Sequence, residues 1–194
     1  MDFNREIASY FDQLAPSWDN NASEYSVRDQ LVSMMRLPSG GVIADIGCGQ
    51  GVLFAHLFRT NPAKIIAVDI SGEMLRGAKQ LFDDDRIEYI HNDFLAAQLP
   101  TFDAAILFNS YPHFLDKNAL TSKCAQVIKK NGILIIAHSQ SKAKINRRHT
   151  GGSMSALSVP LKDAETEAHR FLPFFEPDVL IDNKKFYFIR MLRK

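Results

Sequence analysis

Cysteine is scarce in this sequence of 194 residues: Cys48 and Cys124 are the only two. Two thiols cannot build the disulfide framework of a small secreted protein, and a chain of this length buries roughly 70% of its surface, enough to fold without disulfides or a structural metal. The opening residues, Met1–Glu6, include two acids where a signal peptide would be basic and then apolar. We therefore expect a cytoplasmic protein.

The sequence also lacks an excess of either charge and any long apolar run. Lys and Arg number 23 against 22 Asp and Glu, and a net charge of +1 creates no field that favours nucleic acid or an anionic membrane. The longest wholly apolar stretches, such as Ile133–Ala137, are far too short to span a bilayer. We therefore expect one globular domain, residues 1–194, with no nucleic-acid partner and no membrane association.

Apolar runs of strand length alternate with helical segments along most of the chain, which favours a parallel sheet flanked by helices. The expected strands are Val42–Ile46, Lys64–Val68, Arg86–His91, Phe102–Phe108 and Ile133–Ala137. The expected helices between them are Gly51–Arg59, Ser71–Phe82, which a serine caps, and Asp116–Lys130, which Asn131 and Gly132 end.

The two ends of the chain depart from this alternation. Residues 2–36 carry two amphipathic helical patterns before the sheet begins. Residues 139–159 are polar and basic, which predicts a loop or a mobile helix over the sheet edge. Beyond a helix near residues 161–172, the strands Glu176–Ile181 and Lys185–Leu192 are separated by three polar residues. Such a short link cannot make a parallel crossover, so these two strands must form an antiparallel hairpin.

A glycine-rich turn, Asp45–Gly51 (DIGCGQG), joins the first strand to the first crossover helix. Glycine permits both a sharp turn and a close approach of the backbone to a ligand, so this junction predicts a cofactor site. Asp69 ends the second strand, 22 residues beyond Gly47. A carboxylate at that position can accept two hydrogen bonds from the hydroxyls of a ribose.

These features are compatible with two kinds of cofactor, a dinucleotide and a cationic ligand. A dinucleotide fingerprint, Gly-x-Gly-x-x-Gly, would place its third glycine at position 52, where this chain has Val52. Asp45 would also repel a diphosphate, whereas a cationic ligand suits it.

The Asp-x-Gly-x-Gly-x-Gly turn resembles that of the class I S-adenosylmethionine-dependent methyltransferases. The resemblance implies a doubly wound, Rossmann-like α/β fold with seven strands, mostly parallel, and an antiparallel hairpin at the C-terminus, as the chain's last two strands require. It implies that S-adenosylmethionine is the cofactor. By the family pattern the cofactor-binding residues are Asp45, Gly47, Gly49, Gly51, Asp69, Ile70, Met74, Asp93, Phe94 and Asn109.

The N-terminal segment Tyr10–Asp19 (YFDQLAPSWD) is similar to the opening of the quinone-biosynthesis C-methyltransferases, a branch that acts mainly on small molecules. The expected organisation is therefore a helical lid, residues 1–36, on a cofactor-binding core, residues 40–194. The residues expected at the substrate are Tyr10, Trp18, Tyr111 and Arg147. Tyr10 and Trp18 have packing as an alternative role, and Arg147 belongs to a basic run that is either an anion site or a solvated face.

Methyl transfer from a sulfonium is an in-line displacement, so alignment of the reactants supplies most of the catalysis and no catalytic residue is obligatory. If the acceptor must lose a proton, a histidine is the most suitable base near neutral pH. His113, His138 and His149 follow strands on the side where the acceptor would bind and are the candidates. A three-histidine zinc site is the alternative, but the set has no short spacing motif, and we expect no metal.

Other functions remain possible at this point. An RNA or protein methyltransferase would bring a recognition domain or a basic face, and an adenine-directed enzyme would usually show Asn-Pro-Pro-Tyr where this chain has Asn109–Pro112 (NSYP). A catalytically silent S-adenosylmethionine-binding protein would keep the glycine turn. The favoured reading is a small-molecule methyltransferase that is a monomer or a homodimer.

Overall fold

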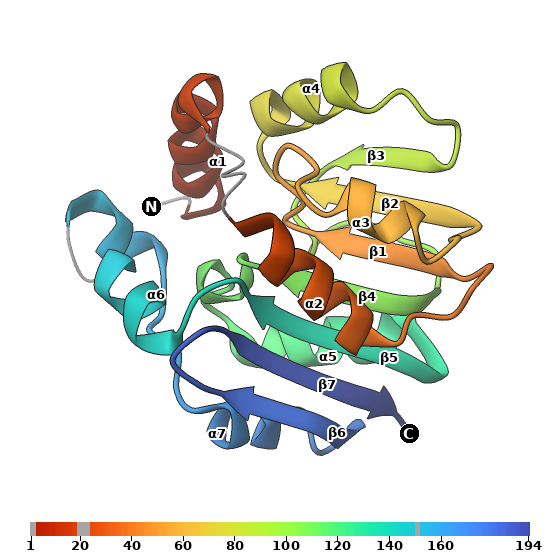
Figure 1. Cartoon of the computed structure of the whole chain (residues 1–194). Coiled ribbons are helices and arrows are strands. Elements are labelled where there is room, and N and C mark those ends of the chain that lie inside the picture. The colour runs from red at the N-terminus through yellow and green to blue at the C-terminus, as the bar shows by residue number, and fades with distance from the viewer. Residues whose placement is uncertain (1–2, 19–23, 150–151) are drawn as a thin grey trace.

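The computed structural model describes residues 3–18, 24–149 and 152–194. Its centre is a seven-stranded sheet in the order β3-β2-β1-β4-β5-β7-β6 (Figure 1). The strands are β1 (Val42–Ile46), β2 (Lys64–Asp69), β3 (Ile87–His91), β4 (Phe102–Phe108), β5 (Ile128–His138), β6 (Phe175–Asp182) and β7 (Tyr187–Arg193). The first five are parallel, and β7 runs antiparallel to both β5 and β6. The predicted fold class and the terminal hairpin are confirmed.

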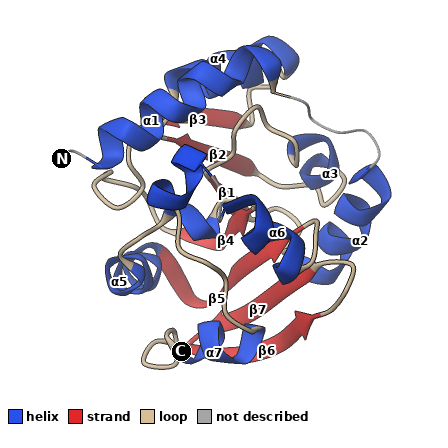
Figure 2. Ribbon diagram, turned by 90° about the vertical axis from the view of Figure 1, so that its left-hand side faces the viewer, coloured by secondary structure: helices blue, strands red, loops and turns tan. Residues whose placement is uncertain are grey.

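Helices cover both faces of the sheet (Figure 2). They are α1 (Phe3–Leu14), α2 (Tyr25–Met35), α3 (Phe54–Phe58), α4 (Gly72–Leu81), α5 (Lys117–Val127), α6 (Lys142–His149) and α7 (Ala164–His169), with single 3-10 segments η1 (Ala15–Ser17), η3 (Tyr111–His113) and η4 (Gly152–Leu157). Neighbouring residues of a strand point to opposite faces. Ile43 therefore joins the core beneath α2, α3 and α4, while Ala44 joins the core beneath α5 and α7.

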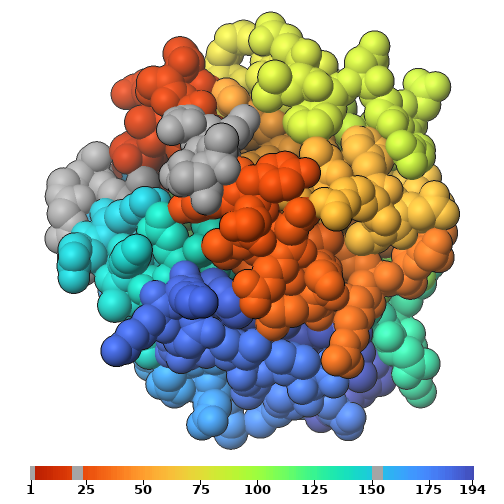
Figure 3. Space-filling model, in the orientation of Figure 1, coloured from red at the N-terminus to blue at the C-terminus, as the bar shows by residue number. Residues whose placement is uncertain are grey.

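The two predicted N-terminal helices are present, and they differ in what they cover. Leu31 and Met35 of α2 are fully buried in the core of the sheet. The backbone carbonyl of Met35 accepts a hydrogen bond of 2.9 Å from Nε of Arg190 in β7. In the space-filling view α2 lies directly above the blue C-terminal hairpin (Figure 3). Thus α2 is a structural layer of the fold, and α1 is the helix left to cover a site.

The helix predicted over Asp116–Lys130 is shorter than expected, because α5 ends at Val127 and β5 begins at Ile128. Ile128 is buried and pairs with Phe102 across the sheet. The register then shifts, and the regular pairing of β5 with β4 resumes at Ile133. A long-range contact with β4 therefore ends the helix before its expected glycine stop.

The segment from 139 to 159, expected as a loop or a mobile helix, forms α6 and η4 in the described residues. The helix expected near residues 161–172 is the shorter α7, which Asp163 caps by accepting a hydrogen bond of 2.8 Å from the Thr166 amide. Within the described residues, every helix is too short or too polar to cross a bilayer.

Candidate active site

A cavity of about 710 Å³ opens at the carboxyl ends of β1, β2 and β4. The order of the sheet reverses between β1 and β4, the place where open α/β sheets bind ligands. Nine of the ten predicted cofactor residues line this cavity: Asp45, Gly47, Gly49, Asp69, Ile70, Met74, Asp93, Phe94 and Asn109. Parallel strands therefore bring to one place side chains that are widely separated in the sequence.

Two glycines shape the turn after β1 by different means. Gly47 has a φ of 69°, and a Cβ on it would lie 2.6 Å from the Cβ of Ser110. Gly49 has a φ of 54°, but a Cβ there would meet nothing within 4 Å among the described residues. Gly47 is thus required by packing as well as by backbone geometry, whereas Gly49 presents open space to the cavity.

The tenth predicted residue, Gly51, does not line the cavity. Its φ is 77°, and a Cβ there would lie 2.5 Å from the ring of Phe54. The glycine allows the turn to pack on that buried ring, so it shapes the turn from outside the cavity lining.

Asp69 is held in a fixed orientation at the end of β2. Its Oδ2 accepts a hydrogen bond of 2.7 Å from the Gly49 amide, and its Oδ1 accepts one of 2.9 Å from the Ser71 amide. Burial raises the pKa of this carboxyl group, while the hydrogen bonds from Ser71 and Gly49 act in the opposite direction. Each oxygen keeps further acceptor capacity, so Asp69 can receive hydroxyl donors from a ligand in the cavity.

Asp45 is the electrostatic anomaly of the site. Its side chain is 1% exposed, and neither carboxylate oxygen has a hydrogen-bond partner among the described residues. Burial, with a smaller contribution from nearby Asp69, raises its pKa to about 8. A buried carboxylate without a donor destabilises the protein, and a cationic ligand in the cavity would remove that cost.

Helix α1 lies over the cavity and is tied to the core by polar contacts. Near its start, Asn4 Nδ2 donates to Asp93 Oδ2 at 2.9 Å. Near its end, Asp12 Oδ1 accepts from Ser71 Oγ at 2.6 Å and from the Glu73 amide at 3.1 Å. Because Ser71 caps the first turn of α4, Asp12 adds a second acceptor to the same helix end. The contacts place α1 beside the residues that follow β2 and β3.

Aromatic side chains from the N-terminal segment contribute the outer wall. Phe11 and Trp18 line the cavity, with their ring centroids 6.1 Å apart. Tyr10 does not line it but packs against Phe11, with centroids 5.4 Å apart. Of the two aromatic residues predicted at the substrate in this segment, Trp18 therefore lines the cavity, and Tyr10 packs on Phe11 outside the cavity lining.

His113, in η3, is the one of the three candidate bases that lines the cavity. Its Nδ1 lies 3.0 Å from the carbonyl oxygen of Leu157. A carbonyl only accepts hydrogen bonds, so Nδ1 carries the proton and Nε2 is left as the basic nitrogen. Burial lowers the pKa of His113 to about 4, so the imidazole is neutral at physiological pH.

The other two histidines do not line the cavity. His138 is completely buried, neither ring nitrogen has a partner among the described residues, and burial lowers its pKa to about 3. His149, on α6, is partly exposed and packs edge-on against His113 with centroids 5.1 Å apart. In the described part of the chain, no three His, Cys, Asp or Glu side chains are placed to hold a metal.

Two predicted substrate residues are also displaced from the cavity. Tyr111 is fully buried, and its hydroxyl donates to Glu167 Oε2 at 2.7 Å on the opposite side of η3. This corrects the expectation that Tyr111 contacts substrate, because its polar group already has a protein partner. Arg147 does not line the cavity, whereas its neighbour Arg148 does. A helix turns successive residues by a large angle, so α6 directs only one of the two toward the site.

Several lining residues were missed by sequence reasoning: Phe11, Arg28, Phe114 and Leu115. Phe11 lies within the segment that carried the resemblance, so proximity to Tyr10 and Trp18 was an available signal. Arg28 is a buried residue of α2, and a polar position in an amphipathic helix gives no such signal.

Comparison with known proteins adds independent evidence. A methyltransferase domain family matches residues 44–136. An uncharacterized methyltransferase of Mycobacterium tuberculosis (strain ATCC 25618 / H37Rv) is 30% identical over 121 residues, which cover 61% of this chain and 59% of that protein. The ubiquinone biosynthesis O-methyltransferase of Xanthomonas axonopodis pv. citri (strain 306) is 29% identical over 117 residues, covering 57% and 48% respectively. This chain thus spans less than two thirds of the length of these relatives.

Solved structures agree at the level of the fold. The N-methyltransferase NodS of Bradyrhizobium japonicum WM9, in complex with S-adenosyl-L-homocysteine, superposes with a TM-score of 0.68 at 16% identity. The match covers 90% of this chain and 89% of NodS. The structural similarity therefore extends well beyond the residues that the domain family matches.

Proposed function

We propose that the protein transfers a methyl group from S-adenosylmethionine to a small-molecule acceptor, and that residues 44–136, which match a methyltransferase domain family, form its class I, S-adenosylmethionine-dependent domain. The observation that carries the proposal is the pair Asp45 and Asp69, which end adjacent parallel strands and face one cavity.

The residues present fit this cofactor. Asp45 is a buried acid without a partner among the described residues, as a positively charged ligand requires. Asp69 is oriented by two backbone amides and would hold the ribose hydroxyls. Gly49 leaves open space between them, into which any larger side chain would project. When bound, S-adenosylmethionine supplies an activated methyl group on a positively charged sulfur.

The chain's own residues would then align the acceptor and exclude water. Phe11 and Trp18 cover the cavity with apolar surface, which removes water from the reacting groups. His113 presents its unprotonated Nε2 because Nδ1 is engaged by Leu157, so Nε2 can accept the proton of an acceptor hydroxyl, thiol or acidic carbon. The lowered pKa makes His113 a weak base in the ligand-free protein. An acceptor without such a proton would need only the alignment.

We propose that the acceptor is compact and largely apolar. Phe11 and Trp18 of the N-terminal segment, and Phe114 and Leu115 after η3, give the cavity apolar lining. The named relative from Xanthomonas acts in ubiquinone biosynthesis, which supports an apolar acceptor without defining it. We further propose that residues 1–194 act as one domain, with α1 as the lid.

Calorimetric titration of the full chain tests the proposal. We expect S-adenosylmethionine and S-adenosylhomocysteine to bind, and Asp69→Asn to weaken both at least tenfold, or about 1.4 kcal/mol, because it removes a charged acceptor. Asp85→Asn, which changes an exposed acid in the turn before β3, is the matched control and should bind both as the unmodified chain does. Binding of NADH with no response to either sulfur compound would refute the proposal.

A further inference from the structure

We propose that Glu167, Tyr111 and Lys117 form a positioning unit that holds η3 in place and thereby fixes the orientation and tautomer of the His113 ring. The inference rests on the proposed function only for the catalytic use of His113. None of the three side chains lines the cavity, so they act on the site through η3.

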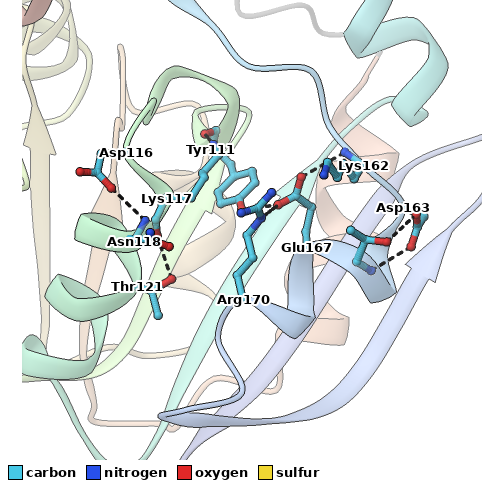
Figure 4. Close-up of polar contacts among 10 residues, drawn as sticks. Tyr111, Asp116, Lys117, Asn118, Thr121, Lys162, Asp163, Glu167 and Arg170 are labelled. Carbon is cyan, nitrogen blue, oxygen red and sulfur yellow. Dashed lines mark hydrogen bonds and ion pairs between the residues drawn. The ribbon is translucent and has the colours of Figure 1, made fainter.

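Glu167 of α7 is the centre of the unit. Its side chain is buried, and its Oε2 accepts from the Tyr111 hydroxyl at 2.7 Å and from Arg170 Nε at 2.9 Å. Its Oε1 accepts from the Lys162 amide at 3.1 Å. Figure 4 shows the carboxylate of Glu167 with Tyr111 and Arg170 on one side and Lys162 on the other. Three donors from separate segments therefore restrain one buried acid.

Lys117 restrains the same tyrosine from the opposite direction. Its Nζ donates to the backbone carbonyl of Tyr111 at 2.5 Å and lies 3.6 Å from the centroid of the Tyr111 ring. The first turn of α5 is itself fixed, because Thr121 Oγ1 donates to the Lys117 carbonyl at 2.8 Å and Asp116 caps the helix. Both the backbone and the ring of Tyr111 are thus clamped between α5 and α7.

His113 lies two residues after Tyr111 on the same short helical turn. The hydrogen bond between its Nδ1 and Leu157 requires the ring to keep one orientation. The carbonyl of the intervening Pro112 accepts a hydrogen bond of 2.9 Å from the Val159 amide. This bond holds residues 157–159 beside the backbone of η3. A shift of Tyr111 would move Pro112 and break the alignment of His113 with Leu157. The contacts of Glu167 are therefore linked through Tyr111 and η3 to His113 in the cavity wall.

Tyr187 provides a matched comparison in the same core. It is also a fully buried tyrosine, but its hydroxyl has no hydrogen-bond partner among the described residues. Removal of that hydroxyl takes one oxygen atom from the same core, as Tyr111→Phe does, but leaves the hydrogen bonds of Glu167 and η3 in place. Tyr187→Phe thus separates the specific effect of the unit from a general loss of packing or polarity.

Nuclear magnetic resonance of the full chain labelled with ¹⁵N-histidine tests the proposal, with S-adenosylhomocysteine added. His113→Asn identifies the signals of this ring. We expect the unmodified chain to show a protonated Nδ1 and an unprotonated Nε2 at neutral pH. Tyr111→Phe and Glu167→Gln should both shift these signals toward a mixture of the two tautomers, while Tyr187→Phe leaves them in place.

If Tyr111→Phe behaves as Tyr187→Phe does, the proposal is wrong, whatever the affinity for S-adenosylhomocysteine. Should Glu167→Gln fail to fold, Tyr111→Phe alone decides the question, since it removes a single oxygen atom. Absence of S-adenosylhomocysteine binding by a chain whose His113 signals respond as expected would instead refute the proposed function and leave the positioning unit standing.

Discussion

A carboxylic acid buried without a partner makes folding and ligand binding respond to pH in opposite ways, and Asp45 is such a group. Burial raises its pKa to about 8, far above that of the unfolded chain. The folded protein therefore retains a proton that the unfolded chain releases, and the stability gained from this proton is present at low pH and lost as pH rises through about 8. A cationic ligand favours the ionised form, so binding improves over the same interval.

We predict that Asp45→Asn raises the unfolding free energy of the ligand-free protein at pH 8.5 by about 1–3 kcal/mol relative to its effect at pH 6, because the neutral amide removes the buried charge that forms above about pH 8. Denaturant unfolding at pH 6 and pH 8.5 measures this change. The same variant should bind S-adenosylmethionine with an affinity that no longer increases between pH 7 and pH 9. A pH dependence shared by the variant and the unmodified chain would show that another group is responsible.

At the level of single residues, the sequence locates side chains along the chain but does not reveal which way they face. Asp69 and Asp45 were predictable because each lies at or one residue before the end of an apolar strand, and strand ends gather at one edge of a parallel sheet. His113, His138 and His149 follow strands or helices in the same region, yet only His113 reaches the cavity. The direction of each ring depends on long-range packing, as between His138 and Tyr187 of β7.

Among the elements, α1 is attached to the core chiefly through its ends. Asp12 makes two hydrogen bonds to the start of α4, at Ser71 and Glu73. Ser71 in turn donates its amide to Asp69, so the attachment of α1 and the ribose-binding residue share a neighbour. The position of this helix over the cavity is therefore coupled to the geometry of the cofactor side.

We predict that Asp12→Ala weakens S-adenosylhomocysteine binding about tenfold, because two net hydrogen bonds of about 0.5–1.5 kcal/mol each are lost. Titration calorimetry gives the affinity, and limited proteolysis should cut within α1 sooner than in the unmodified chain. Glu6→Ala, a change at an exposed position of the same helix, is the control. Equal affinities and equal cleavage rates for Asp12→Ala and Glu6→Ala would show that the hydrogen bonds of Asp12 do not hold α1 in place.

The elements themselves follow from local sequence wherever local signals agree. β1, β4 and α4 were predicted nearly to the residue, because apolar runs and a capping serine mark their ends. The end of α5 was predicted three residues late, since Ile128 is withdrawn from the helix by pairing with Phe102. Phe102 is distant from Ile128 in the sequence, so a prediction from the residues around the helix cannot include this contact.

For the molecule as a whole, histidines with lowered pKa values oppose the stabilisation that Asp45 gives in acid. Burial lowers the pKa of His113 to about 4 and that of His138 to about 3, and it lowers the pKa of His149 as well. Groups with a depressed folded pKa leave the unfolded chain binding more protons. The stability they contribute is present above about pH 6.5, the ordinary histidine value, and is lost as pH falls toward 4.

We predict that the unfolding free energy of the protein decreases between pH 6.5 and pH 4, and that His138→Gln reduces this slope by up to about 1.4 kcal/mol per pH unit. Urea titrations at half-unit intervals of pH provide the measurement. His169→Gln, at an exposed position at the end of α7, is the control. A slope that His138→Gln leaves intact would assign acid sensitivity to other groups.

The sheet has two edge strands, β3 and β6, and the second of them bears on how copies of the chain behave together. Glu176, Pro177 and Asp178 are exposed along it, and its register with β7 shifts between Pro177 and Val179. Proline has no amide hydrogen to offer a neighbouring strand, and flanking acids repel an identical edge. A second copy of the chain therefore finds a poor template at β6, which protects the protein against edge-to-edge aggregation at high concentration.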